Sequence, residues 1–305
     1  MTICLNMIVK DEAEVIARCL RSVKNSIDYW VIADTGSTDE TKNIIQEELK
    51  GVPGELYDRP WRGFAETRNS ALWLAREVAD HLLFIDADEV LTGDLPENLT
   101  EDAYYLPVEY NNLRYVRGAL VRNDGSWRWE GVVHEVLIRD NPVNWAKLDH
   151  PTIKVHTDGA RSKDPDKYLK DANLLKADLE KNPTNARTAY YLSQSLRDAG
   201  YYEAAIHAYK YRAIMPGWDE ETWSALYQIG RIKMFLGRDP EEVQGAMLKA
   251  YNFRPSRAEP LWQLMKYHMG RNEPALAELF RRKAEVIPFP DDRLFVEPEA
   301  YRSAA

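Results

Sequence analysis

Short apolar runs alternate with amphipathic stretches through the first half of the chain, and this alternation limits the fold more than any other feature of the sequence. Thr2–Val9 is an almost continuous apolar run, as expected for a strand buried on both faces of a sheet. Tyr29–Ala33, Glu55–Asp58 and Leu82–Ile85 are predicted as further strands. Helical periodicity separates these runs, and strand–helix–strand units of this length predict a mainly parallel, doubly wound sheet with right-handed crossovers.

Two of the intervening helices are expected to begin at capping boxes. Asp11 with Glu14 has this spacing, and Ser37 with Glu40 repeats it before a helix that reaches about Leu49. Apolar residues at helical spacing mark the buried faces of the first and third helices: Val15, Ile16, Cys19, Leu20 and Val23, then Ala71, Leu74, Ala75 and Val78. The polar residues after each strand therefore fall where open α/β sheets bind ligands, at the carboxyl ends of the strands.

The second half of the chain, beyond about Lys163, is predicted to be helical and repetitive. Prolines recur there at spacings of 33, 39 and 33 residues and glycines at 37 and 33, at Pro183, Pro216, Pro255 and Pro288 and at Gly200, Gly237 and Gly270. Small residues at the helix crossings, aromatic residues nearby and a terminal proline match the tetratricopeptide pattern, whose period is about 34 residues. We therefore predict an α/β domain over residues 1–162, tetratricopeptide-like helices over 163–290, and a tail over 291–305 that packs back on the body.

Composition excludes several classes of protein. The chain has 305 residues, 45% hydrophobic and 29% charged, as is typical of a globular protein with a core. No apolar run approaches the roughly 18 residues of a transmembrane helix, and the first residues lack the features of a signal peptide, so the cytoplasm is the expected compartment. The net charge of -9 disfavours binding to nucleic acid. Cys4 and Cys19 are too few for a disulfide framework or a closed zinc site, and buried thiols are expected.

The strongest chemical signal is Asp86-Ala87-Asp88, directly after the predicted strand Leu82–Ile85. Side chains two residues apart on an extended chain face the same way, so the two carboxylates could hold one hard cation. Such a cation can bridge the phosphates of a diphosphate leaving group. An acidic turn without a ligand would contain the same residues, so the triplet alone leaves both interpretations open.

Four segments in order add specificity to that signal. They are Ile8-Val9-Lys10-Asp11-Glu12, then DTGSTD from Asp34, then ETRNSAL from Glu66, then FIDADE from Phe84. Together they resemble the family 2 inverting glycosyltransferases of the GT-A fold, over about residues 1 to 160. The repeats that follow make the chain similar to the subgroup that joins this catalytic domain to tetratricopeptide helices. The resemblance implies a GT-A (Rossmann-like) nucleotide-sugar-binding domain that transfers a hexosyl group with inversion.

The resemblance also implies a donor site and a metal. The donor is a nucleotide-sugar, with UDP preferred by analogy, and Mn²⁺ or Mg²⁺ is the implied cofactor. The implied donor-binding residues are Ile8, Val9, Lys10, Asp34, Arg68, Asp86, Ala87 and Asp88. Among them, Asp34 contacts the base or ribose, Arg68 the base or a phosphate, and Asp88 the metal. Many family members have an aromatic residue after the first strand, whereas this chain has Lys10 and Asp11.

Segment Trp127–Glu135 resembles the part of such enzymes that lies on the acceptor side. Inversion requires the acceptor's hydroxyl or thiol to lose its proton on the face opposite the diphosphate, and a half-buried carboxylate can accept that proton. Glu135 is predicted to be this general base, with Glu130 as second choice, while His134 contacts phosphate or orients Glu135. The two tryptophans of the segment either stack on a sugar or belong to the core.

His156 is predicted to be a third metal ligand beside Asp86 and Asp88, because GT-A folds often take one from a histidine near the end of the catalytic domain. A neutral imidazole suits Mn²⁺ better than Mg²⁺. A surface or satisfied core histidine is the alternative. The polar stretch Thr157–Asp166 is either a flap over the donor diphosphate, with its basic side chains as phosphate partners, or a plain linker.

Two other functions are open at this point. In a binding protein the catalytic half would be degenerate, although the intact aspartates argue against decay. A nucleotidyltransferase would need a glycine-rich loop after the first strand, and MIVKDEAEV has no glycine. The repeats either hold a peptide, protein or glycan acceptor on a concave face or form a homodimer interface. Aromatic residues either line that face or fill the helix packing: Tyr190, Tyr191, Tyr209 and Trp223.

Overall fold

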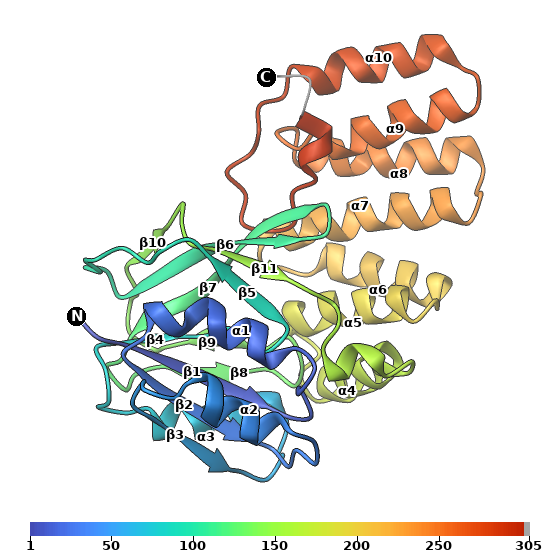
Figure 1. The fold of residues 1–305 in the computed structure, drawn as a ribbon. Helices are drawn as coiled ribbons and strands as arrows, with labels where there is room; N and C mark the ends of the chain where they lie inside the picture. Colours follow the sequence, from blue (N-terminus) through green and yellow to red (C-terminus); the bar gives the residue numbers. More distant parts are fainter. Residues whose placement is uncertain (302–305) are drawn as a thin grey trace. The chain divides into compact units, whose positions relative to one another are not determined.

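The computed structural model describes residues 1–301 and divides the chain into two compact units (Figure 1). The first unit comprises Met1–Asn111 and Tyr115–Pro165, and the second comprises Asn112–Arg114 and the chain from Asp166 onward. None of the helices among residues 1–301 combines the length and apolar character needed to cross a membrane.

The elements of the first unit alternate between strand and helix as far as β4 and are mostly strands afterwards. In chain order they are β1 (Ile3–Val9), α1 (Ile16–Val23), η1 (Lys24–Ser26), β2 (Tyr29–Asp34), α2 (Thr41–Glu48), β3 (Gly54–Asp58), α3 (Phe64–Leu74), β4 (His81–Leu83), β5 (Glu89–Thr92), β6 (Ala103–Tyr110), β7 (Leu113–Arg122), β8 (Arg128–Glu130), β9 (Val136–Ile138), β10 (Trp145–Lys147), β11 (Thr152–Val155) and η2 (Ala160–Lys163).

A nine-stranded mixed sheet is the centre of this unit, with the order β3-β2-β1-β4-β7-β6-β11-β5 and with β10 paired to β6. β1 lies parallel to both β2 and β4, and β2 lies parallel to β3. β7 and β5 each run antiparallel to a neighbour. The predicted α/β, GT-A-like fold is confirmed, but the sheet is parallel only on the side built by strand–helix–strand units. The later strands follow one another without helices and add a mixed half.

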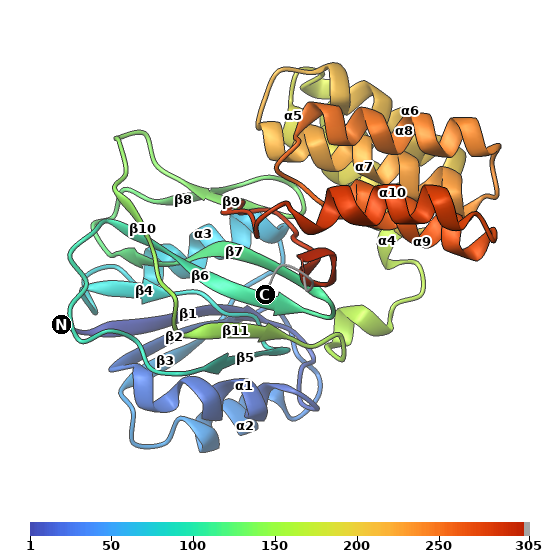
Figure 2. The same cartoon turned by 90° about the horizontal axis from the view of Figure 1, so that it is seen from above.

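Both faces of β1 are buried, which explains its almost continuous apolar sequence. Leu5 and Met7 belong to the core cluster that contains Ile16 and Leu20 of α1, whereas Cys4 belongs to the cluster on the opposite face. Helices α1 and α2 cover one face of the sheet, and α3 covers the other (Figure 2).

The predicted capping boxes are wrong. Neither α1 nor α2 has a side-chain hydrogen bond at its first turn from the predicted cap. Instead, the Asp11 backbone N–H donates to Ser37 Oγ at 2.9 Å, and Asp11 Oδ1 accepts from the Thr38 N–H at 2.7 Å. Asp11 has a φ of 53°. Polar side chains after β1 and β2 therefore tie the two loops together, which sequence spacing cannot distinguish from helix capping.

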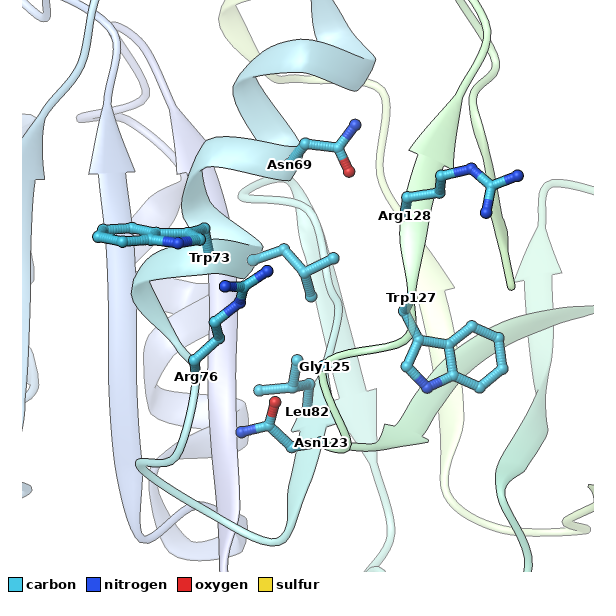
Figure 3. Close-up of a pocket in the computed structure, with 9 residues that line it drawn as sticks. Asn69, Trp73, Arg76, Leu82, Asn123, Gly125, Trp127 and Arg128 are labelled. Carbon is cyan, nitrogen blue, oxygen red and sulfur yellow. The ribbon is translucent and has the colours of Figure 1, made fainter. Parts of the chain in front are cut away.

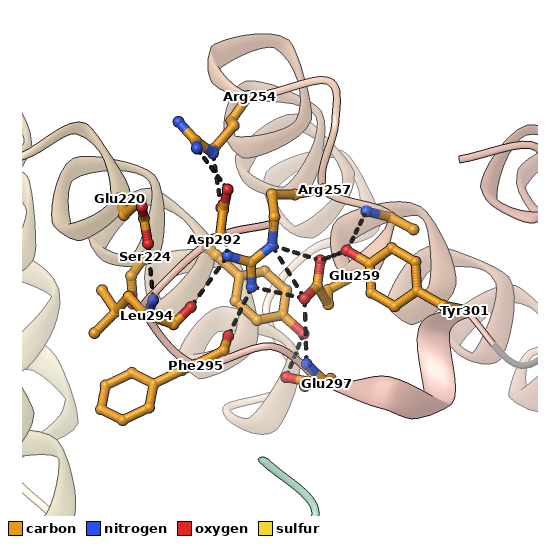
Figure 4. A network of polar contacts seen from close by, with 12 residues as sticks. Glu220, Ser224, Arg254, Arg257, Glu259, Asp292, Leu294, Phe295, Glu297 and Tyr301 are labelled. Carbon is orange, nitrogen blue, oxygen red and sulfur yellow. Dashed lines mark hydrogen bonds and ion pairs between the residues drawn. The ribbon is translucent and has the colours of Figure 1, made fainter. Parts of the chain in front are cut away.

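The second unit is helical, and each helix packs against the next one in the chain (Figure 1). Its elements are α4 (Lys167–Lys181), α5 (Ala186–Asp198), α6 (Tyr202–Ile214), α7 (Asp219–Phe235), α8 (Pro240–Phe253), α9 (Glu259–Gly270), α10 (Pro274–Glu285) and η3 (Pro298–Tyr301). Tyr190, Tyr209 and Trp223 are buried in helix packing, so they do not line an open face. The chain after α10 returns to α7 and α9, where buried charges hold it (Figure 4).

Candidate functional site

The carboxyl ends of β1, β2 and β4 lie side by side at one edge of the sheet. The β1–β2 register aligns Val9 with Asp34, so these two strands end together. Lys10 follows β1, Asp34 ends β2, and Asp86 lies three residues beyond β4. The parallel half of the sheet therefore brings three of the predicted donor-binding segments to one place.

The aspartate motif is a tight turn. The Glu89 N–H donates to the Asp86 carbonyl at 3.0 Å, and the Asp86 N–H donates to Glu89 Oε2 at 2.9 Å. Asp86 and Asp88 are consequently not two residues of an extended strand, as the sequence predicts, because β4 ends at Leu83 and the chain reverses into β5. Ala87 is buried in the core and anchors the turn.

Arg68 of α3 joins two of the predicted site carboxylates. Its guanidinium contacts Asp86 Oδ1 at 2.6 Å and Glu135 Oε1 at 2.5 Å, and it lies over the Trp129 ring at 5.1 Å from the ring centre. Burial opposes ionisation of Asp86, but the guanidinium groups of Arg68 and Arg117 outweigh it and hold the pKa of Asp86 below its usual value. Glu135 is therefore held beside the aspartate motif although it lies 49 residues later.

Arg117 of β7 is a second cation of the site that the sequence analysis missed. It binds Glu89 through two contacts of 2.8 and 2.6 Å and lies 3.9 Å from Asp86 Oδ2. Glu89 is 2% exposed. Arg117 belongs to a strand with no recognisable motif, so only the pairing of β7 with β4 reveals its position.

Asp88 is the one carboxylate of the turn without an ion pair among residues 1–301. Burial, followed by the neighbouring carboxylates of Asp86, Glu89 and Glu12, raises the pKa of Asp88 to about 7. Arg68 and Arg117 pair with Asp86, Glu89 and Glu135, so carboxylates outnumber guanidinium groups here and Asp88 adds a further acidic group. The oxygen donor and this uncompensated charge fit a hard divalent cation that takes its other ligands from phosphate and water.

His156 lies beside the turn. Its backbone N–H donates to the Asp88 carbonyl at 3.1 Å, since the chain leaves β11 next to the start of β5. Within the described residues, no three His, Cys, Asp or Glu side chains are grouped to hold a metal ion. The backbones of Asp86, Asp88 and His156 therefore lie near one another, but the three side chains do not form a preformed metal site. Metal binding stays a prediction.

The carboxylate of Asp34 is fully buried and only half satisfied. Oδ1 accepts the N–H groups of Gly36 and Ser37 at 2.9 and 2.8 Å, and Lys42 Nζ lies 3.7 Å away. Oδ2 is buried and has no hydrogen-bond partner among residues 1–301. A buried acceptor of this kind normally has a partner, so Asp34 has the capacity to accept one more N–H or O–H from a ligand.

The residues at the end of β1 differ in what they can offer. The Val9 side chain is 4% exposed in the core, so it does not line a pocket, and its carbonyl accepts the N–H and the hydroxyl of Thr35. Ile8 is partly exposed and Lys10 exposed. Of the three predicted residues, only these two present side chains to a ligand, because alternate strand residues face opposite sides.

The segment around Glu135 divides into buried and exposed parts. Glu130 is exposed and pairs with Arg128 at 3.0 Å, which makes it less suited to a general-base role than Glu135, whose side chain is only 9% exposed. His134 is exposed, with a φ of 54°. Trp127 is 6% exposed and donates Nε1–H to the Arg122 carbonyl at 3.0 Å, so it belongs to the core.

The backbone of the predicted flap lies directly over Asp88. A Cβ placed on Gly159 would lie 3.0 Å from Asp88 Oδ2, so a side chain at residue 159 would crowd the carboxylate. The Ala160 N–H donates to Glu12 Oε2 at 3.0 Å. The polar stretch is thus packed on the site in this structure.

The basic side chains of this stretch contact protein groups. Lys163 pairs with Glu14 at 2.6 Å, and the Arg161 guanidinium lies over the Phe64 ring at 4.5 Å from its centre. Both basic side chains therefore pack against groups of the first unit.

A separate cavity of about 220 Å³ lies between α3 and residues 123–128 (Figure 3). Its lining contains none of the residues predicted to bind donor, metal or acceptor: Asn69, Leu72, Trp73, Arg76, Leu82, Asn123, Gly125, Trp127 and Arg128. The Trp73 ring points away from Trp127 in Figure 3. The residues predicted to carry the chemistry therefore lie at the strand ends, whereas this cavity lies along the flank of α3.

Comparison with known proteins finds a family model that matches most of the first unit. Residues 4–149 match the family model described as glycosyl transferase family 2. An uncharacterized glycosyltransferase of Rickettsia felis is 34% identical over 110 residues, which cover 36% of this chain and 35% of that protein. The SPbeta prophage-derived glycosyltransferase SunS of Bacillus subtilis is 25% identical over 215 residues, covering 64% of this chain and 49% of SunS.

A further relative has tetratricopeptide (TPR) repeats in its name. A TPR repeat-containing protein of Synechococcus elongatus is 32% identical over 168 residues, covering 49% of this chain and 40% of that protein. The chain thus spans half or less of the length of these curated relatives. Among solved structures, S. aureus TarS 1-349 aligns over 97% of this chain and 99% of that chain, with 14% identity and a TM-score of 0.40.

Proposed function

We propose that the first unit, whose residues 4–149 match the family model described as glycosyl transferase family 2, moves a sugar from a nucleotide-sugar, with UDP as the nucleotide, to an acceptor. The observation that carries the proposal is a pair of carboxylates that can accept a further partner, near the carboxyl ends of β2 and β4, the two strands that flank β1. Asp34 has a buried oxygen without a partner, and Asp88 has no ion pair among residues 1–301. A nucleoside supplies N–H and O–H donors that Asp34 could accept. A divalent cation bound to the diphosphate would take Asp88 as a ligand.

A divalent cation, Mn²⁺ or Mg²⁺, would be held by Asp88, with Asp86 or His156 as further ligands, and would neutralise the charge that develops on the diphosphate leaving group. The protein itself prepares that place. Arg68 and Arg117 form ion pairs with the neighbouring carboxylates, so Asp88 is the carboxylate of the turn that can bind a cation.

Glu135 is the proposed general base. The acceptor's oxygen or sulfur forms a bond to the anomeric carbon while the bond to the diphosphate breaks, and the acceptor's proton passes to Glu135. The electron pair of the broken bond leaves with the diphosphate, so the sugar is inverted in one step. Arg68 fixes Glu135 through Oε1, which leaves Oε2 to take the proton. His134 and Glu130 are less suited because both are exposed.

The acceptor is proposed to be a polypeptide or a glycan that offers a hydroxyl or thiol. A hydroxyl and a thiol differ in acidity, and a thiol needs less help from a base. Loss of Glu135 should therefore impair transfer to a hydroxyl more than transfer to a thiol.

A panel of nucleotide-sugars with Mn²⁺ or Mg²⁺ tests the proposal, with released nucleotide as the readout. Metal-dependent release from at least one donor is expected, and Asp88→Ala should abolish it. Asp94→Ala, which changes an exposed aspartate of the same unit, is the matched control and should keep full release. Equal release by wild type and Asp88→Ala would contradict the proposal.

A further inference from the structure

The chain after α10 lies against one face of the helical unit. Leu294 shares a hydrophobic cluster with Tyr190 of α5 and Ile229 of α7, and Val296 shares one with Leu264 of α9. Helices α5, α7 and α9 are the first helices of successive pairs. In tetratricopeptide arrays, repeated elements of this kind line the extended concave surface that binds partners. Residues 292–297 thus occupy the face that would otherwise be open.

Two charged side chains of this face hold the backbone of the segment (Figure 4). Glu220 Oε2 accepts the N–H groups of Arg293 and Leu294 at 2.8 and 2.7 Å. Arg257 donates to the carbonyls of Leu294 and Phe295 at 3.2 and 2.6 Å. Main-chain contacts of this kind fit any extended peptide, as in the modes by which folded domains recognise peptides.

Side chains at the two ends of the segment add a charge pattern. Asp292 binds Arg254 at 2.8 and 2.6 Å and Arg257 at 2.9 Å. At the other end, Glu297 accepts hydrogen bonds from α7 and α9 at 2.9, 3.0 and 3.0 Å, from Tyr227, Arg231 and Gln263. Between the acids, Leu294 and Val296 are 6% and 2% exposed. Between the same two ends, the Arg293 guanidinium lies over the Trp218 ring at 4.9 Å from its centre, and Phe295 packs against the cluster of Leu294. The segment therefore reads acid, arginine, aliphatic, aromatic, aliphatic, acid.

The central cation of the face also has partners outside the segment. Arg257 is fully buried, stacks 3.7 Å over the Trp223 ring centre, and contacts Glu259 at 2.7, 3.0 and 3.1 Å. Glu259 remains as its partner when the tail is absent, so the charge does not become unpaired. The connection from Pro288 to Asp291 is largely exposed, with Phe289 at 52%.

We propose that this face is a peptide-binding groove, that residues 292–297 fill it in cis, and that a polypeptide with the same acid–aliphatic–aliphatic–acid pattern displaces them in trans. The groove is defined by Glu220, Tyr227, Arg231, Arg254, Arg257 and Gln263. The inference goes beyond the proposed function and does not depend on sugar transfer, because it concerns binding alone.

The test opens the groove after the protein has folded. A protease site is inserted after Phe289 in the full chain, the folded protein is cut, and the released tail is removed by dialysis. The probe is a fluorescent peptide of residues 288–301, PFPDDRLFVEPEAY, and its anisotropy reports binding. The uncut chain should bind at least ~100-fold more weakly, because the tethered tail competes at a millimolar effective concentration.

Variants check which contacts are used. Leu294→Asp in the probe should weaken binding at least tenfold, and Glu220→Gln in the protein should weaken it about tenfold through two charge-assisted hydrogen bonds. Leu294→Asp in the uncut chain should open the groove to the wild-type probe, which needs no cleavage. Lys233→Gln, at a pair with Glu242 away from the tail, is the control and should leave binding unchanged.

Sequence-dependent binding to the cut protein supports the proposal. Equal binding of a scrambled peptide, or no binding at all, overturns it. Unfolding of the cut protein once the tail is removed also overturns it, since the segment would then be a permanent part of the core. Dimers that form by exchange of tails between two copies would likewise overturn it in favour of a swapped assembly. None of these outcomes bears on nucleotide release, so the two proposals fail separately.

Discussion

Asp88→Asn is expected to stabilise the fold above pH 7 while it abolishes sugar transfer. Burial and the neighbouring carboxylates raise the pKa of Asp88 from 3.8 to about 7. A carboxyl with a raised pKa contributes fully to stability below pH 3.8, and that contribution is lost as the pH rises through about 7. Asparagine resembles the protonated form, so it removes the penalty that the charged form carries at high pH.

The magnitude follows from the two pKa values. The difference between 3.8 and about 7 sets an upper bound of ~4 kcal/mol, at 1.36 kcal/mol for each pKa unit. Asp88 is partly exposed, so solvent screening reduces the expected gain to ~1–2 kcal/mol. One kcal/mol changes the Tm of a domain of this size by about 2–4 °C, so a rise of about 2–8 °C is expected at pH 8 and almost none at pH 4.

Thermal unfolding at pH 4 and pH 8 measures the effect. Asp80→Asn is the control of opposite sign, because hydrogen bonds from the Thr2 backbone N–H and hydroxyl lower the pKa of Asp80. Asp80→Asn should lose stability at pH 8 and little at pH 2. If Asp88→Asn also lost stability at pH 8, the reasoning about an uncompensated acidic cluster would be refuted.

Three further predictions follow from the first unit. Arg68→Met should lower the free energy of unfolding by about 3–5 kcal/mol, because it leaves the largely buried Glu135 without its ion-pair partner. The control Arg62→Met removes an exposed ion pair and should lower it by less than ~1 kcal/mol. Equal losses for the two variants in urea denaturation would contradict this prediction. Burial and Arg122 lower the pKa of His81, so its contribution to stability is present above pH 6.5 and is lost as the pH falls through its folded pKa. His81→Leu should flatten that acid loss in a pH series of Tm values, and an unchanged slope would count against it. Glu135→Gln should slow transfer to a hydroxyl acceptor at least ~100-fold with donor affinity by calorimetry unchanged, and normal transfer would remove Glu135 from the mechanism.

The local sequence pattern was sufficient to predict the strands in the parallel half of the sheet. The apolar run of β1 and the later runs predicted strands close to their observed bounds, because burial on both faces demands apolar residues throughout. Most of the strands from β5 onward were not predicted, since half-buried strands in a mixed sheet show weaker patterns. Asp11 and Ser37 were misread as helix caps because loop-to-loop and cap hydrogen bonds use the same residue types.

The candidate site was predictable only where motifs are contiguous. Asp34, Asp86 and Asp88 were found because each lies within a few residues of a strand end. Arg117 was missed because its role depends on the pairing of β7 with β4, which no local spacing encodes. The ion pair between Arg68 and Glu135 joins residues 67 positions apart, so it likewise emerges only from the folded chain.

The central claim is that Asp88 meets a divalent cation together with a diphosphate. Electron paramagnetic resonance of Mn²⁺ tests it directly, with the full chain titrated in the absence and presence of UDP. UDP is expected to strengthen Mn²⁺ binding to the wild-type protein. Asp88→Asn is expected to remove this UDP-dependent Mn²⁺ binding. Mn²⁺ binding that ignores UDP, or that survives Asp88→Asn unchanged, would contradict it.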